Sequence, residues 1–333
     1  MLNDSRKSSR SLPFFVLILL FTLSACDSGT PPSRSLEVAV QGVYGASISA
    51  DASHTIIASM NHGGSLWSLD DSERRYNWNH KSEGYSELTA AAFSPDGQFA
   101  VTADYQNLVL WEVPTGKGIR FWNSPDQILD LELMPDARYA LLGMENYTAV
   151  LFDVQIGGVR RVFHHDNRVR SVSLSADGRY ALTGSEDHTA RLWDTETGEL
   201  LHKIEHDDEV RLVELSPEGD IAFSVSKYDT AMLWHTADGE LIGELPMRSF
   251  ALQRGLTFQS ARFSSDGSEL LTGTSDRVVQ LWSTSGLRSI RSWTIPKRDA
   301  WKPNSAAVLA LGFEKSGGAY WAVSSNGFLH RLK

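Results

Sequence analysis

The clearest pattern along the chain is a short-period alternation of apolar and polar residues, interrupted at regular places by turn residues. Within residues 164–198, three short segments alternate in this way, and turn residues separate them. A two-residue period is typical of half-buried β-strands, and the Asp177–Gly178 pair favours a tight turn. This stretch therefore predicts three strands of a four-stranded unit, namely VRSVSLS, YALTGS and TARLWD.

The same unit recurs along the chain. Its third strand ends near a large apolar residue, and the intervals between successive copies are 44, 41, 41, 41, 48 and 50 residues. The equivalent positions are Trp67, Trp111, Phe152, Trp193, Trp234, Trp282 and Leu332. Strands and turns repeated at about forty residues are typical of propeller blades. We therefore predict an all-β fold, a seven-bladed β-propeller of four-stranded blades.

The two ends of the repeat region are predicted to close the ring. The last unit ends at residues 330–333, which leaves no room for an outer strand, whereas the segment LEVAV at residues 36–40 precedes the first complete unit. Pairing these segments would remove the free sheet edges that an open stack exposes. The N-terminal strand is therefore expected to complete the last blade.

The repeated units resemble those of the Trp-Asp (WD) repeat family over residues 36–333. In that family, a His before the first strand, a Ser or Thr in the second, an Asp in the following turn and the Trp form a hydrogen-bonded tetrad. The resemblance implies this structural role for His165, Thr183, Asp187 and Trp193. Such a network satisfies the buried indole N–H and fixes a strand to a loop.

Other units keep only part of the tetrad. Tyr228 takes the Asp position of the fifth unit, Arg254 lies near the His position of the sixth, and His80 is expected to serve the second unit across a longer loop. The first, third and seventh units lack the set, so we expect them to depend on apolar packing. The partial tetrads comprise His206, Ser224 and Trp234 in the fifth unit and Thr272, Asp276 and Trp282 in the sixth.

A different pattern occupies the N-terminus. Basic residues precede an apolar run at residues 13–23, which is too short for an ordinary spanning helix and is typical of a secretory signal. The run ends in LSAC, which resembles a bacterial lipobox, and the resemblance implies acylation of Cys26. The alternative is a plain secretory signal followed by a chance cysteine. The predicted organisation is a lipoprotein signal peptide at residues 1–25, a lipidated cysteine with a flexible tether at 26–35, and the propeller at 36–333.

Charge and cysteine content limit the partners. The formal net charge of −10 becomes −12 without residues 1–25, because that segment holds three basic residues and one acid. This balance disfavours general binding to nucleic acid or anionic lipid. Cys26 is the single cysteine, so intramolecular disulfides are excluded. We therefore expect membrane attachment through the Cys26 lipid, on the periplasmic side, and Asp27 resembles an inner-membrane retention signal.

No sequence motif indicates catalysis. The His164–Asp166 triplet has no second His or Cys group at metal-ligand spacing. The chain also lacks a G-x-S-x-G elbow, a zinc-protease helix and a phosphate-binding Gly loop. We therefore expect no metal, no cofactor and no enzyme activity. The alternative is a cofactor-binding or hydrolytic propeller, which would need titratable groups with shifted pKa values clustered at the channel mouth.

One face of the predicted ring is the expected partner-binding surface, because binding residues concentrate on loops held by a rigid scaffold. Three arginines in adjacent units predict a basic spot there, the alternative being ordinary solvated charges. Three large aromatic residues, Tyr85, Phe250 and Trp301, lie on longer loops of the same face. The candidates are Arg168, Arg170, Glu186, Arg211, Lys227, Phe250 and Trp301. The chain is thus predicted to be a monomeric, membrane-anchored scaffold for protein partners in the bacterial cell envelope.

The anchor gives a direct prediction. Cys26→Ser should move the protein from the membrane fraction to the soluble fraction, because the lipid is the expected attachment. Fractionation followed by immunoblotting measures this shift. A Cys26→Ser protein that stays with the membrane would refute the lipobox interpretation.

Overall fold

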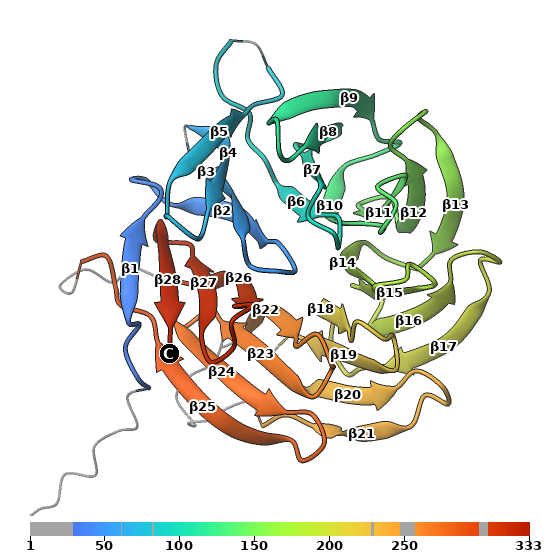
Figure 1. Ribbon diagram of the computed structural model, residues 1–333. Helices are drawn as coiled ribbons and strands as arrows, with labels where there is room; N and C mark the ends of the chain where they lie inside the picture. The colour runs from blue at the N-terminus through green and yellow to red at the C-terminus, as the bar shows by residue number, and fades with distance from the viewer. Residues whose placement is uncertain (1–28, 61, 82, 228–229, 247–256, 300–305) are drawn as a thin grey trace, which may run out of the picture.

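The protein folds as a ring of small antiparallel sheets arranged around a central channel (Figure 1). This computed structural model describes residues 29–333 except 61, 82, 228–229, 247–256 and 300–305. Within these residues, 28 strands form seven sheets of four strands each, and no helix is long and apolar enough to cross a bilayer. The prediction of an all-β, seven-bladed propeller is confirmed.

Six blades use four consecutive strands each, and the seventh combines the last three strands with the first. Blade 1 contains β2 Val43–Ile48, β3 His54–Ser59, β4 Gly63–Ser68 and β5 Arg74–Trp78; blade 2 contains β6 Ala90–Phe93, β7 Phe99–Ala103, β8 Asn107–Glu112 and β9 Lys117–Asn123. Blade 3 contains β10 Ile128–Leu133, β11 Tyr139–Met144, β12 Thr148–Asp153 and β13 Val159–His164; blade 4 contains β14 Val169–Leu174, β15 Tyr180–Ser185, β16 Thr189–Asp194 and β17 Leu200–Glu205. Blade 5 contains β18 Val210–Leu215, β19 Ile221–Ser226, β20 Ala231–His235 and β21 Leu241–Glu244; blade 6 contains β22 Phe258–Phe263, β23 Glu269–Thr274, β24 Val278–Ser283 and β25 Arg288–Thr294. Blade 7 contains β26 Val308–Phe313, β27 Tyr320–Ser324, β28 Phe328–Leu332 and β1 Arg34–Glu37.

Blade 4 shows why the sequence pattern folds this way. β15 and β16 are mostly buried because they lie inside their sheet, whereas β17 lies at the outer edge of the ring and is largely exposed. In the turn before β15, Ser175 Oγ donates to Asp177 Oδ1 (2.6 Å) and Gly178 adopts a φ of 74°. A side-chain oxygen that accepts local hydrogen bonds and a residue free to take positive φ explain the Ser-x-Asp-Gly turn.

Neighbouring blades interlock where a glycine on one blade faces a valine on the next. A Cβ on Gly184 of β15 would lie 2.8 Å from Val210 Cγ1, and a Cβ on Gly143 of β11 would lie 2.9 Å from the main-chain oxygen of Val169. Because packed interiors tolerate little added volume, these glycines allow the first strand of the next blade to approach.

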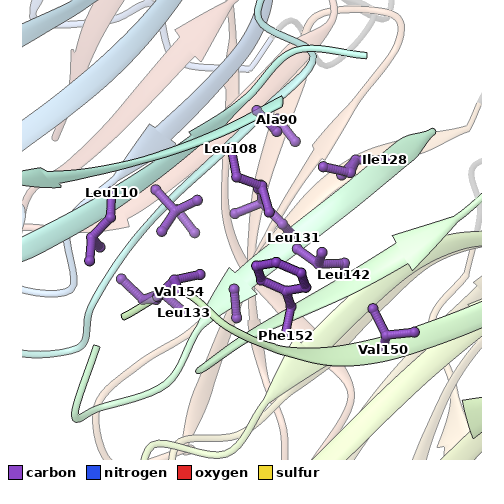
Figure 2. Close-up of a cluster of buried hydrophobic side chains, with 14 of the residues drawn as sticks. Ala90, Leu108, Leu110, Ile128, Leu131, Leu133, Leu142, Val150, Phe152 and Val154 are labelled. Atoms are coloured by element: carbon purple, nitrogen blue, oxygen red, sulfur yellow. The ribbon is translucent and has the colours of Figure 1, made fainter. Parts of the chain in front are cut away.

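Apolar side chains fill the remaining space between blades. Figure 2 shows the cluster between blades 2 and 3, in which Phe152 of β12 lies among aliphatic side chains such as Leu131, Leu142 and Leu108. These four residues are at most 4% exposed. The ring is therefore held by a series of such inter-blade cores, and each blade depends on both neighbours.

β1 closes the ring. It pairs antiparallel with β28, so that Arg34 lies opposite Arg331 and Glu37 lies opposite Phe328 (Figure 1). The predicted completion of the last blade by an N-terminal strand is confirmed, although the strand begins at Arg34, two residues before the predicted segment.

A polar network reinforces this seam. The His330 ring bridges Ser35 Oγ, 2.7 Å from its Nδ1, and Ser324 Oγ, 2.9 Å from its Nε2. His330 is 1% exposed, and burial lowers its pKa to about 4. In blade 1, Trp67 Nε1 donates to Ser65 Oγ (3.0 Å). The first and seventh blades lack the complete set, as expected, and pack through apolar cores, to which these polar contacts are added.

The chain joins the propeller earlier than predicted. Thr30 forms a parallel bridge with Trp293 of β25, through hydrogen bonds from Thr30 N to Ser292 O (2.9 Å) and from Thr294 N to Thr30 O (3.1 Å). Ser33 N then donates to Arg331 O (2.8 Å). The prediction of a flexible tether over residues 26–35 is corrected accordingly, because its second half is bound to blades 6 and 7.

Candidate interaction face and central channel

The four residues of the complete tetrad form one hydrogen-bonded chain in blade 4. Trp193 Nε1 donates to Thr183 Oγ1 (2.9 Å), which lies 2.7 Å from His165 Nε2. His165 Nδ1 lies 2.9 Å from Asp187 Oδ2, which also accepts from Arg191 (2.9 Å). Burial lowers the pKa of His165. Burial alone would raise the pKa of Asp187, but hydrogen bonds from His165 and Thr189 hold it well below its usual range.

Blade 5 builds a similar network with one replacement. Trp234 Nε1 donates to Ser224 Oγ (3.1 Å), and His206 Nε2 lies 2.9 Å from the same oxygen. Tyr228, at the Asp position, lies outside the described residues. Thr230 Oγ1 instead lies 3.2 Å from His206 Nδ1. A hydroxyl thus takes the place of the carboxylate, and burial lowers the pKa of His206 to about 4.

Blade 2 completes its network across a longer loop. His80 Nε2 and Trp111 Nε1 each lie 2.8 Å from Thr102 Oγ1, and His80 Nδ1 lies 3.4 Å from Asp104 Oδ2. The predicted role of His80 is confirmed. Thr102 and Asp104 were not predicted, because Thr102 and Trp111 are 9 positions apart, against 10 for Thr183 and Trp193, and the carboxylate is shifted relative to the repeat.

Blade 6 keeps only the indole contact among its predicted members. Trp282 Nε1 donates to Thr272 Oγ1 (2.8 Å). Asp276 accepts a hydrogen bond from Thr274 Oγ1 and thereby caps its own turn. Arg254, near the His position, lies outside the described residues.

These networks hold one face of the ring, which we call the entry face: the face with the loops before each first strand and the turns after each second strand. Arg168 and Arg170 lie on this face but are not free. Arg168 pairs with Glu145 of blade 3 (2.8 Å), and Arg170 pairs with Glu186 (2.5 Å). The same Glu186 oxygen lies 3.5 Å from Arg211 of blade 5.

The ion pairs continue through blade 5. Arg211 also pairs with Glu209, and Lys227 Nζ lies 3.7 Å from the same Glu209 oxygen. Arginines of blades 4 and 5 are therefore neutralised by carboxylates between them. The predicted basic spot was wrong, because acidic residues at the neighbouring loop and turn positions alternate with the arginines.

The other half of the entry face carries exposed tyrosines. They come from the start of β2, the β5–β6 loop, the β7–β8 turn and the β11–β12 turn, in blades 1, 2 and 3. The tyrosine surface consists of Tyr44 (54% exposed), Tyr85 (58%), Tyr105 (56%) and Tyr147 (50%). The His62 and Tyr85 ring centroids lie 5.6 Å apart. Tyr105 and Tyr147 were not predicted, because a tyrosine in a turn gives no sequence pattern of its own.

The backbone under this surface is fixed. Tyr105 O accepts from Ile128 N (2.9 Å), and Tyr147 O accepts from His165 N (2.9 Å). Each tyrosine in a turn is thus tied to the next blade through its main chain while its ring projects outward. Phe250 and Trp301, the other aromatic residues predicted for this face, lie outside the described residues, as does Cys26.

The central channel gathers partly buried ionisable groups. It encloses about 310 Å³ and is lined by the first strands of the blades, including Asp130, Glu132, Glu214 and Arg262. Burial raises the pKa of Asp130 to about 7 and that of Glu214 to about 8, and it also raises the pKa of Glu132. Arg262 lies 3.6 Å from Glu214. Among the described residues, no group of three or more His, Cys, Asp or Glu could hold a metal ion.

Two of these carboxylates have a structural use. Asp130 Oδ2 accepts from Val172 N (2.9 Å), and Glu132 Oε2 accepts from Leu174 N (2.6 Å). Both donors belong to β14, the innermost strand of the next blade, whose inner edge has no partner strand. These side chains therefore satisfy main-chain groups that line the channel.

The architecture defines the class as a seven-bladed β-propeller with tetrad-stabilised blades. Residues 157–194 and 256–283 match the family described as WD domain, G-beta repeat. The first segment contains the whole blade 4 tetrad, and the second contains the Thr272–Trp282 contact. No curated protein shows a significant match to the chain. WD repeats are thus shown in blades 4 and 6 of this seven-bladed propeller, and WD-repeat propellers are typically protein-interaction scaffolds.

Thr183→Val tests the tetrad. The substitution keeps the shape of the side chain but leaves a buried indole N–H and a buried imidazole nitrogen unpaired, so we expect a loss of about 2–4 kcal/mol in the free energy of unfolding. Thr148→Val is the control, because its exposed partner Asn146 can bond to water. Urea denaturation measures the free energy of unfolding of both variants. Equal losses in the two variants would contradict a structural tetrad.

Glu214→Gln tests the channel. The pKa of Glu214 is raised from 4.5 to about 8 on folding, so its contribution to stability is lost as pH rises through this window. At pH 8 the variant should be more stable than the wild type by at least about 1 kcal/mol, and near pH 4 the two should be alike. Thermal unfolding between pH 4 and 8 measures the difference. Glu218→Gln, at an exposed turn, should keep the wild-type pH dependence; a Glu214→Gln curve parallel to the wild type would contradict the burial argument.

Proposed function

We propose that this chain is a membrane-anchored WD-repeat lipoprotein and a non-catalytic scaffold for protein–protein interaction in the bacterial cell envelope. The lipobox-like LSAC segment ending at Cys26 supports the anchor and the periplasmic side. The WD-repeat fold supports the scaffold role. The partner binds the entry face, and the propeller acts as a monomer because β1 leaves no ring edge open for exchange between copies.

The tyrosine surface is the observation that carries this proposal. Tyrosine is enriched at protein interfaces because it combines a large apolar ring with a hydroxyl and loses little side-chain entropy. Tyr44, Tyr85, Tyr105 and Tyr147 lie on one face of three consecutive blades and are each at least half exposed. The opposite half, over blades 4 and 5, is occupied by internal ion pairs. The partner therefore contacts blades 1 to 3.

A second candidate function, ligand binding or hydrolysis at the channel mouth, is favoured by Glu214. The sequence predicts that such a site would need titratable groups with shifted pKa values clustered at the channel mouth. Glu214 has a raised pKa and contacts Arg262, which fits this expectation. Asp130 and Glu132, however, already accept main-chain N–H groups of the next blade. The scaffold function therefore explains more of the molecule, and Glu214→Gln should leave partner binding unchanged.

The test is crosslinking in cells followed by purification of the tagged chain. Tyr105→Ala with Tyr147→Ala should lower partner recovery about tenfold or more, since truncating an interface hot spot costs about 2 kcal/mol or more. The matched control is Phe121→Ala with Ile156→Ala, which truncates apolar residues of blades 2 and 3 that lie away from the entry face and are more exposed than the two tyrosines. Unchanged recovery from the tyrosine variant, or equal loss in the control, would refute the tyrosine surface.

A further inference from the structure

We propose that the propeller stands edge-on to the membrane, with the outer edge of blades 6 and 7 resting on anionic phospholipid headgroups. This edge, which we call the anchor edge, consists of β25 and β1 with the intervening residues 30–33. The inference rests on the proposed lipid anchor at Cys26 and goes beyond it, since an anchor alone does not say which side of the ring faces the bilayer.

The length of chain between the lipid and the fold is the first argument. Three residues separate Cys26 from Thr30, and Thr30 is hydrogen-bonded to Ser292 and Thr294 of β25. Four Cα steps span at most about 14 Å. A lipid chain on Cys26 lies in the bilayer, so Thr30 and the strand that binds it are held within this distance of the headgroups.

Charge is the second argument. The anchor edge presents Arg288 and Arg291 on β25, Arg34 on β1 and Lys297 just after β25, and all four are exposed. No ion pair joins Arg288 or Arg291 to another of the described residues, and the turn before them, Thr284–Leu287, holds no acid. These cations lie on a chain whose net charge without residues 1–25 is −12.

Exposed cations also lie on the outer strands of blades 2 and 3, such as Lys117 of β9 and Arg160 of β13, but these strands do not carry the segment that leads to Cys26. In blade 1, Arg75 pairs with Asp71, four residues before it, and in blade 4 Lys203 pairs with Glu205 (3.2 Å). On the anchor edge, the acid is Glu37 of β1, which pairs with Arg298 (2.7 Å), so this edge keeps a net positive charge. Exposed basic residues near an anionic leaflet are each worth about fivefold in local binding. Net charge disfavoured general binding to anionic lipid, but this local edge complements the headgroups.

An exposed apolar residue completes the surface. Ile290 lies between Arg288 and Arg291 on β25 and is 53% exposed. Edge-on contact would place this side chain at the headgroups and leave both faces of the ring open to the periplasm. The tyrosine surface of blades 1 to 3 would then remain accessible to a partner (Figure 1).

The experiment uses the acylated chain on vesicles that carry a headgroup-attached quencher. Because the sulfur of Cys26 carries the lipid, a new cysteine can be labelled alone. A fluorophore at Ile290→Cys on β25 should be quenched several-fold more than one at Phe121→Cys on β9, across the ring (Figure 1). The excess should be present with phosphatidylglycerol and should fall on pure phosphatidylcholine.

Charge reversal supplies the matched control. Arg288→Glu with Arg291→Glu should abolish most of the excess quenching at Ile290→Cys, whereas Lys117→Glu with Arg160→Glu, the same change on exposed residues of β9 and β13, should preserve it. Equal quenching at the two probes would overturn the inference. Excess quenching at Ile290→Cys that does not change with lipid charge or with the Arg288 and Arg291 substitutions would overturn it as well. Mass spectrometry that shows an unacylated chain would refute the anchor itself. This outcome is distinct from failure of the edge-on orientation.

Discussion

The hydrogen-bonded pairing of β1 with β28 is the contact on which the rest of the molecule depends. Without it, blade 7 would have three strands, and the mostly buried β28 would become the exposed outer edge of its sheet. Each inter-blade core is shared by two blades, so opening one seam would weaken both neighbours. The same segment leads from the ring toward Cys26, and the closure therefore also sets where an anchor can lie.

Inside the closed ring, hydrogen bonds between polar side chains fix the entry-face loops, which apolar packing alone does not hold. The Trp–Thr–His–Asp network of blade 4 and its variants in blades 2 and 5 tie the entry loops to the second and third strands. The main-chain N–H of His165 also donates to Tyr147 O, so the tetrad is joined to the tyrosine surface through the backbone. A face held in this way loses little freedom when a partner binds, which favours recognition by rigid aromatic side chains.

The fold could be predicted from periodicity, because each blade repeats the same strand pattern and the same turn residues. The Asp177–Gly178 turn is an example of this repeated turn chemistry. The tetrad of blade 4 followed from a family resemblance. Features that depend on contacts between blades could not be predicted. The partners of Arg168 and Arg211, and the use of Asp130 to satisfy Val172 N, arise from residues of different blades that meet only in the closed ring. His330 was missed because it enters its network from the third strand of a blade.

Native-state hydrogen exchange at the seam tests the closed ring most directly. The amide of Ser33 donates to Arg331 O (2.8 Å) and that of Val38 donates to Gly327 O (2.9 Å). If β1 is an integral part of blade 7, both amides should exchange only through global unfolding, as slowly as those of a central strand such as β12. Exchange at the rate of exposed turns would mean that β1 frays independently, and it would contradict both the closure and the fixed anchor edge.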